Sequence, residues 1–246
     1  SKIVPFSEHN QIFVSFFANN AAVTIERAIM NRELILRMMS MAELRDPTET
    51  GAHVQRVGAY SAEIYERWAL NRGIDEERIK ATRDLIRLAA MLHDVGKVGI
   101  PDAILKKPGK LTEEEFEEIK KHTVYGAKLF TSITSELDAM SLVIALNPHE
   151  KWDGRGYPGC VPGLAEGGET PPPAKQGENI PITARITALA DVYDALCSRR
   201  SYKEPLADED VYRIIRENAG THFDPEVVEA FFQITDVLKA IRNKFQ

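Results

Sequence analysis

Histidine and carboxylate side chains recur along this chain at spacings that could place them around one centre. Glu49 and His53 are four residues apart, so they share one face of a helix. His93 and Asp94 are adjacent, and Lys97 follows His93 by about one helical turn. An ammonium group at that spacing can lie beside whatever His93 binds. Ligands of this mixed kind suit Mn, Fe, Zn or Ni, whereas an all-oxygen set would suit Mg or Ca.

Three later segments carry the same residue types. His122 ends a predicted helix, His149 opens a loop rich in glycine and aromatic residues, and Asp191 and Asp194 lie three apart on a later predicted helix. An aspartate can bridge two cations with its two oxygens, and paired cations both generate hydroxide and hold a phosphoryl group. These residue types and spacings are compatible with a metal site, although each histidine taken alone is more often a hydrogen-bonded core or surface residue. The other two histidines, His9 and His222, are assigned to ordinary surface or core roles.

Composition limits the class of protein. The 246 residues carry a net charge of -6, which does not favour a protein that coats duplex nucleic acid. No stretch approaches the roughly 18 apolar residues of a membrane span. The two cysteines, Cys160 and Cys197, lie far apart without a metal-binding motif, which is typical of a reducing cytosol. We therefore expect a soluble, cytoplasmic protein.

The elements that must position these residues are all predicted to be helices. Residues 8–45 contain no proline or glycine and carry an apolar stripe at helical spacing, which needs a partner to cover it. That partner is either a second copy of the chain or the domain that follows. Further helices are predicted at 50–71, 76–93, 112–122, 125–146, 182–198, 207–218 and 225–243. Since no alternating strand pattern occurs, the predicted fold is all-α.

Two boundaries divide the chain. Residues 1–45 are predicted to form a linker or dimerisation helix, and residues 46–246 one helical domain. Within the second, residues 163–181 are rich in glycine and proline and show no periodicity. A loop of this length inside a compact domain is uncommon, and we interpret it as a mobile insertion.

Five segments in order resemble the HD-GYP subgroup of the HD phosphohydrolase superfamily, over roughly residues 44–232. They read GAHVQRV from Gly51, LHDVGKVGIP from Leu92, KHTVYG from Lys121, HEKWDGRGYP from His149, and ADVYDAL from Ala190. An adjacent His-Asp pair alone would be weak evidence, whereas the ordered set is specific. The resemblance implies an HD-domain helical bundle.

The resemblance also implies roles for individual residues. Asp94 would bridge two cations, Glu49 would support a third, and Lys97 would contact the scissile phosphate. The implied cofactors are two or three divalent transition-metal ions, most often Fe or Mn, with Ni or Zn as alternatives. The implied metal ligands are Glu49, His53, His93, Asp94, His122, His149 and Asp191.

The activity that this resemblance implies is hydrolysis of cyclic di-GMP to linear pGpG, and onward to GMP in some members. Besides Lys97, the implied substrate contacts are Tyr157, Asp194, Arg200 and Lys203. Residues 13–27 resemble the final helix of a GAF sensor domain. The chain would then be the output part of a signalling protein, dimeric through its N-terminal helix.

One departure from the family pattern bears on activity. The family has two consecutive histidines before the glutamate, but here Pro148 precedes His149. A proline cannot coordinate through its side chain, so water, Glu150 or Glu49 would have to fill that place. This leaves two alternatives open: a module that binds cyclic di-GMP without cutting it, and a hydrolase acting on another cyclic dinucleotide or a nucleotide.

Overall fold

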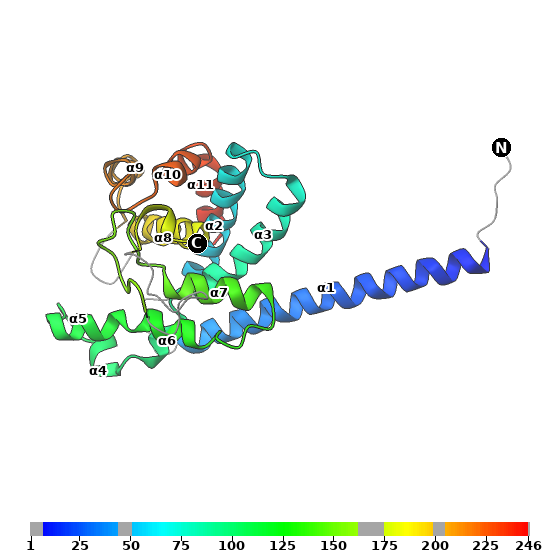
Figure 1. Cartoon of the computed structure of the whole chain (residues 1–246), viewed down its shortest axis with the longest axis horizontal. Coiled ribbons are helices and arrows are strands. Elements are labelled where there is room, and N and C mark those ends of the chain that lie inside the picture. Colours follow the sequence, from blue (N-terminus) through cyan, green and yellow to red (C-terminus); the bar gives the residue numbers. More distant parts are fainter. Residues whose placement is uncertain (1–6, 44–50, 162–174, 199–204, 246) are drawn as a thin grey trace. The chain divides into compact units, whose positions relative to one another are not determined.

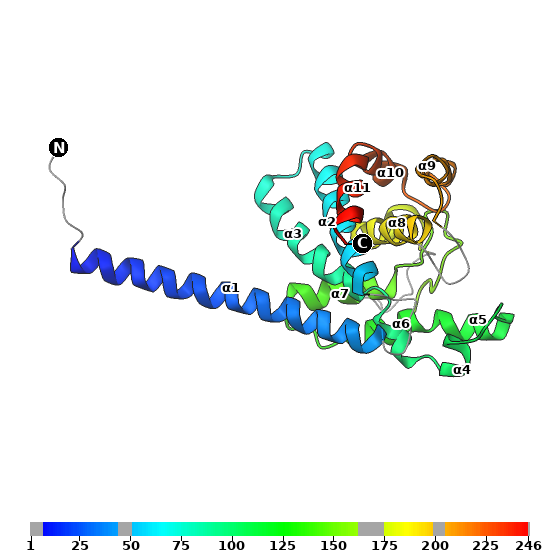
Figure 2. The same cartoon turned by 180° about the vertical axis from the view of Figure 1, so that it is seen from behind.

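The computed structural model describes residues 7–43, 51–161, 175–198 and 205–245, and the side chains of residues 39–43 are outside that description. Every regular element in these ranges is a helix (Figures 1 and 2). The chain divides into two compact units, residues 1–38 and 39–246. The described residues include no helix long and apolar enough to cross a membrane.

Helix α1 (Glu8–Glu43) provides nearly all of the first unit. Ser7 caps it, because its Oγ accepts a hydrogen bond of 3.2 Å from the backbone N–H of Asn10. The large apolar side chains of its first half are exposed, including Phe13 and Phe17, whose rings lie 5.0 Å apart. A 36-residue helix with this much apolar surface needs a partner to cover it.

Helix α2 (Gly51–Asn71) is the centre of the second unit. It packs against α3 (Glu76–Ala89), α8 (Ile182–Cys197), α10 (Pro225–Phe232) and α11 (Thr235–Lys244) (Figure 2). Three fully buried rings join three of these helices: Tyr60 lies 5.1 Å from Tyr193, and Tyr193 lies 5.0 Å from Phe231, in edge-to-face geometry. This core fixes α2 against α8, and each of these two helices carries a predicted metal ligand.

The short elements between α3 and α8 complete the unit (Figure 1). Helix α7 (Glu136–Leu146) packs against α3, α6 (His122–Lys128) and α8, and α6 packs against the 3-10 helix η2 (Val95–Gly99). The remaining bounds are η1 (Ala90–Leu92), α4 (Asp102–Leu105), α5 (Glu113–Lys120), η3 (Gly177–Asn179) and α9 (Asp208–Glu217).

Two glycines let η2 and α6 approach backbone to backbone. A Cβ atom on Gly96 would lie 1.9 Å from the carbonyl oxygen of His122 and 2.3 Å from the amide nitrogen of Gly126. No side chain fits there. The turn after His93 and Asp94 is therefore held directly against the first turn of the helix that begins at His122.

The two helix starts predicted from capping residues are confirmed, whereas His122, predicted to end a helix, begins α6. Thr112 and Glu115 form the capping box that opens α5, with hydrogen bonds of 3.3 and 2.8 Å. Asp224 caps α10, with Pro225 in its first turn. Two predictions of single helices, over 125–146 and 225–243, are wrong, since each segment forms two helices. The first is interrupted before Ser135, whose hydroxyl caps α7.

Candidate metal centre

Five separate segments bring six of the predicted ligands together. His53 lies in the first turn of α2, and the pair His93-Asp94 occupies the sharp connection between η1 and η2. The other three are His122 at the start of α6, His149 just after α7, and Asp191 within α8. Their ligand atoms form two groups, His53 with His93 and Asp191, and Asp94 with His122 and His149.

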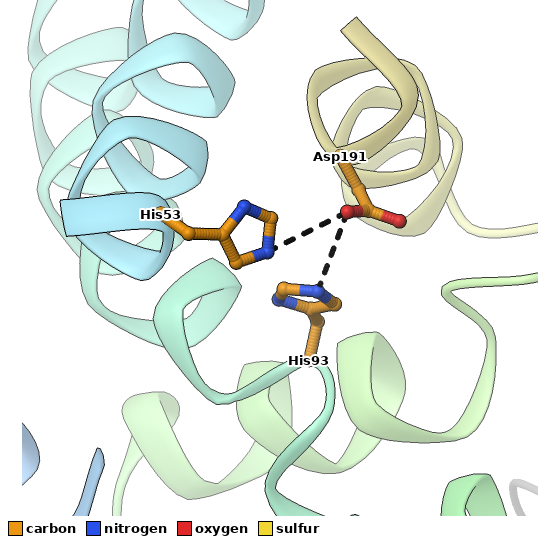
Figure 3. A group of neighbouring side chains, drawn as sticks. All are labelled: His53, His93 and Asp191. Carbon is orange, nitrogen blue, oxygen red and sulfur yellow. Dashed lines mark ion pairs between the residues drawn. The ribbon is translucent and has the colours of Figure 1, made fainter. Parts of the chain in front are cut away.

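The first group, which we call triad 1, consists of His53, His93 and Asp191. One oxygen of Asp191, Oδ1, lies 3.6 Å from Nε2 of His53 and 3.8 Å from Nε2 of His93. Figure 3 shows both imidazole rings turned toward that oxygen from different elements. Separations of this size leave room for a cation that draws all three donors to about 2.0–2.2 Å.

The second group, triad 2, consists of Asp94, His122 and His149. Oδ1 of Asp94 lies 3.0 Å from Nε2 of His122 and 3.3 Å from Nε2 of His149. His149 is the most open of these side chains, at 23% exposure, whereas His122 is buried. Each triad thus combines two buried residues with one that is partly exposed, Asp191 in triad 1 and His149 in triad 2.

The two triads meet at the carboxylate of Asp94. While its Oδ1 faces triad 2, its Oδ2 lies 3.6 Å from Nε2 of His93 and 2.7 Å from Nζ of Lys97. Burial would raise the pKa of Asp94, but the charges of Lys97, His93 and His122 hold it well below its usual range. Asp94 is thus an ionised carboxylate with one oxygen directed to each triad, which is the geometry of a bridging ligand.

Backbone carbonyls orient two of the imidazole rings. Nδ1 of His93 lies 2.8 Å from the carbonyl oxygen of Ala90, and Nδ1 of His122 lies 2.6 Å from that of Ile119. Because a carbonyl can only accept, each Nδ1 carries a proton, and Nε2 is the nitrogen that faces the triads. Nε2 of His93 is buried and makes no hydrogen bond within the described part of the chain. Such an atom fits a metal ion, since a buried imidazole nitrogen without a partner is costly.

Asp194 does not occupy the position expected of a substrate contact. Its side chain is 1% exposed, and its Oδ2 accepts a hydrogen bond of 2.8 Å from Nδ1 of His53. Arg56 donates to both of its oxygens, over 2.6 Å from Nε and 2.9 Å from Nη2. We therefore correct the expectation that Asp194 contacts substrate, because both of its oxygens are already bound inside the protein.

Tyr157 covers triad 2 with its aromatic ring. The ring lies 4.9 Å from that of His149, at 34°, and 6.4 Å from that of His122. Burial raises the pKa of Tyr157, and the nearby charges of Asp94 and Asp191 raise it further, so the hydroxyl stays protonated.

The loop that carries Tyr157 is tightly folded. A Cβ atom on Gly156 would lie 2.3 Å from the amide nitrogen of Lys151 and 2.5 Å from the carbonyl oxygen of His149. Glu150 is buried, and its Oε1 accepts a hydrogen bond of 2.7 Å from the backbone N–H of Gly159. Glu150 therefore holds this loop closed and is not grouped with either triad, so it is a poor substitute for the ligand that Pro148 removes.

Three predicted site residues, Glu49, Arg200 and Lys203, lie outside the described residues, and so do residues 163–174 of the predicted insertion. The described end of that insertion is attached to the site loop. Nζ of Lys175 lies 2.7 Å from Oδ1 of Asn147, and the N–H of Gly177 donates to the carbonyl of Trp152 over 2.8 Å.

Sequence reasoning missed Arg56, although it lies three residues after His53 and thus on the same side of α2. Among the described residues, neither of the two histidines set aside belongs to a group of candidate metal ligands. His9 is exposed on α1, and the ring of His222 stacks on Phe223 at 4.3 Å.

An all-helical domain that brings histidine and aspartate side chains together in this way is the arrangement expected of an HD domain. The chain matches the HD domain family over residues 37–227, and it belongs to that family. This confirms the resemblance drawn from the sequence motifs. A solved Vibrio cholerae structure, of a cyclic GMP-AMP specific phosphodiesterase, superposes with a TM-score of 0.53 at 18% identity. The superposition covers 85% of this chain and 53% of the solved chain, and it confirms the all-α HD fold.

Curated relatives match most of this chain. A cyclic di-GMP phosphodiesterase of Thermotoga maritima is 43% identical over 85% of this chain and 51% of its own length. Two proteins of Vibrio cholerae each match 96% of this chain: a 3'3'-cGAMP-specific phosphodiesterase 2, 38% identical over 42% of its length, and a cyclic di-GMP phosphodiesterase, 40% identical over 45% of its length. The chain thus spans about half the length of the curated relatives it matches.

Proposed function

We propose that this chain is the hydrolytic part of a signalling protein and cuts cyclic di-GMP to linear pGpG, and onward to GMP. One observation carries the proposal: the Asp94 carboxylate directs one oxygen to each of two His/Asp triads, with the Lys97 ammonium 2.7 Å away. The names of the curated relatives, which include cyclic di-GMP phosphodiesterases, support the same substrate class.

The six ligands of the two triads would hold two divalent cations, with Fe or Mn as the first choice, Ni or Zn as alternatives, and Glu49 available for a third ion. When bound, paired cations lower the pKa of a water molecule and stabilise negative charge on a phosphoryl group. The donor set fits, since it combines four imidazoles with two carboxylates.

The chain's own residues would act around that centre. Lys97 would place its positive charge beside the scissile phosphate, where charge grows in the transition state. Tyr157, protonated and close to Asp94, would donate a hydrogen bond to a phosphate oxygen. Arg200 and Lys203 would bind the second phosphate or a guanine edge, for which the planar guanidinium of an arginine is suited.

Two further parts of the proposal concern assembly and location. The exposed apolar residues of α1 would be covered by α1 of a second copy, giving a homodimer. Among the described residues, Cys160 and Cys197 form no disulfide, which is typical of the reducing cytoplasm.

A turnover assay with two substrates tests the proposal. The purified chain would be loaded with Mn(II) or anaerobic Fe(II), given cyclic di-GMP or 3'3'-cGAMP, and followed by chromatography of the linear products. We expect kcat/KM to favour cyclic di-GMP. A preference for 3'3'-cGAMP would instead support the specificity named for one relative, and binding without turnover of either would support a binding module.

A further inference from the structure

Three of the predicted histidine ligands use Nδ1 in a hydrogen bond within the protein, and their partners differ in kind. Two of them, His93 and His122, donate Nδ1–H to a backbone carbonyl within their own turn. His53 instead donates to the carboxylate of Asp194, 141 residues away in sequence, over 2.8 Å. A carboxylate partner makes an imidazole a stronger electron donor through Nε2 than a carbonyl partner does.

Asp194 is in turn fixed by Arg56. The guanidinium of Arg56 donates to both carboxylate oxygens, and both side chains are buried, at 10% and 1% exposure. Arg56 also donates to the carbonyl oxygen of Phe245, over 3.0 Å, and to Oγ of Ser198, over 3.0 Å. The pair thus joins α2, the end of α8 and the last described residue of the chain.

We infer that Asp194, held by Arg56, is a positioning residue that sets the cation affinity of triad 1 and leaves triad 2 largely unaffected. It acts through His53, because it fixes the tautomer and orientation of that ring and polarises it toward Nε2. Among the contacts that the structure describes, no ligand of triad 2 touches Arg56 or Asp194. Asp94 contacts Lys97, His122 contacts the carbonyl of Ile119, and His149 contacts Asp94. The inference rests on the proposed function only in treating the triads as cation sites.

A lone replacement of Asp194 would leave the buried charge of Arg56 without its partner, which is strongly destabilising. The informative variant is therefore the double change Arg56→Met with Asp194→Leu. It removes the acceptor of His53 and leaves no buried charge behind. Ser198→Ala is the matched control, because it removes a hydrogen bond to the pair and keeps the contact to His53.

The test is a calorimetric titration of the metal-stripped chain with Mn(II), in the absence of nucleotide. His53→Ala identifies binding at triad 1, and His149→Ala identifies binding at triad 2. We expect the double variant to bind Mn(II) at triad 1, the site lost in His53→Ala, roughly 10- to 100-fold more weakly than wild type. Binding at triad 2, the site lost in His149→Ala, should stay within about two-fold of wild type, and Ser198→Ala should match wild type.

Turnover supplies a second readout. In the double variant, kcat at low Mn(II) should fall and recover with excess Mn(II), while KM for substrate stays unchanged. Unchanged affinity at triad 1, or equal weakening of both triads, would overturn the inference. Because the titration uses Mn(II) alone, a chain that binds the ion normally but cuts no cyclic dinucleotide would refute the proposed function and leave this inference standing.

Discussion

The ammonium group of Lys97 lies 2.7 Å from Oδ2 of Asp94, the oxygen that faces triad 1. Lys97 sits on η2, and η2 is held by the close approach of Gly96 to α6. A positive charge beside a bridging carboxylate opposes cation binding. Lys97 must therefore serve a purpose other than holding the cations. We assign it the stabilisation of charge on the substrate phosphate, and that role makes a prediction.

Replacing Lys97 by Met should lower kcat by roughly 100- to 1000-fold, because one donor aimed at developing charge is worth that much. Metal content should stay equal or rise, since a repulsive charge has been removed. Both quantities can be measured on one preparation, by product chromatography and elemental analysis. If the variant lost its metal, Lys97 would be supporting the centre itself and this explanation would be wrong.

The contact between η2 and α6 should tolerate no side chain at Gly96. A Cβ atom there would lie 1.9 Å from the carbonyl oxygen of His122, so Gly96→Ala must displace one backbone from the other. We expect a loss of about 3 kcal/mol or more in the free energy of unfolding, together with loss of Mn(II) binding at triad 2. Denaturant unfolding of the metal-stripped chain measures the first effect. Val98→Ala, an exposed position on the same turn, is the control and should change stability little.

His222 should make stability depend on pH. Burial lowers its pKa to about 4, helped by the charges of Lys151 and His149. In the unfolded chain its pKa is about 6.5. Between these values the unfolded chain binds the proton more readily, so the contribution of His222 is complete above about pH 6.5 and is lost as pH falls toward about 4.

The measurement is the free energy of unfolding at pH 7.5 and at pH 4.5, in the metal-stripped chain. Between these two pH values, wild type should lose roughly 1–3 kcal/mol more of its free energy of unfolding than His222→Gln does. The range is reduced because the His222 ring is partly exposed and water screens its charge. Equal losses in the two proteins would show that the ring is not shielded from water.

The apolar surface of α1 should decide the oligomeric state. Phe17 and Ile25 are 60% and 59% exposed, and a second copy of the helix would cover them. The double change Phe17→Glu with Ile25→Glu should convert a dimer into a monomer, as measured by light scattering after size exclusion. Asn19→Glu, a charge added at a polar position of the same helix, should leave the dimer intact. A variant that remained dimeric would place the interface elsewhere.

Much of this organisation could be predicted from the sequence. Caps such as Thr112 and Asp224 act locally, so their residue types determine where α5 and α10 begin. The ligands could be chosen because five segments in order resemble the HD-GYP family, and the resemblance implies at least one ligand in each of them. Within the sequence itself, however, nothing says which of these ligands would share a triad, because that depends on how α2, α6 and α8 pack.

The roles of Asp194 and Arg56 could not be read in advance for the same reason. Asp194 lies three residues after a ligand on the same helix, which suggests a place in the site. Its actual partners, Arg56 and His53, come from a helix about 140 residues earlier. Only the packing of α2 on α8 brings Asp194 to Arg56 and His53. Asp194 therefore forms an internal ion pair where the sequence predicted a substrate contact.

The bridging role of Asp94 is the central claim, and one comparison tests it most directly. Asp94→Ala and Asp236→Ala, an exposed aspartate on α11, would be loaded with Mn(II) and incubated with cyclic di-GMP under identical conditions. We predict that the first variant forms no linear product and binds fewer cations, while the second matches wild type in both. Product formation by Asp94→Ala at the wild-type rate would contradict the account.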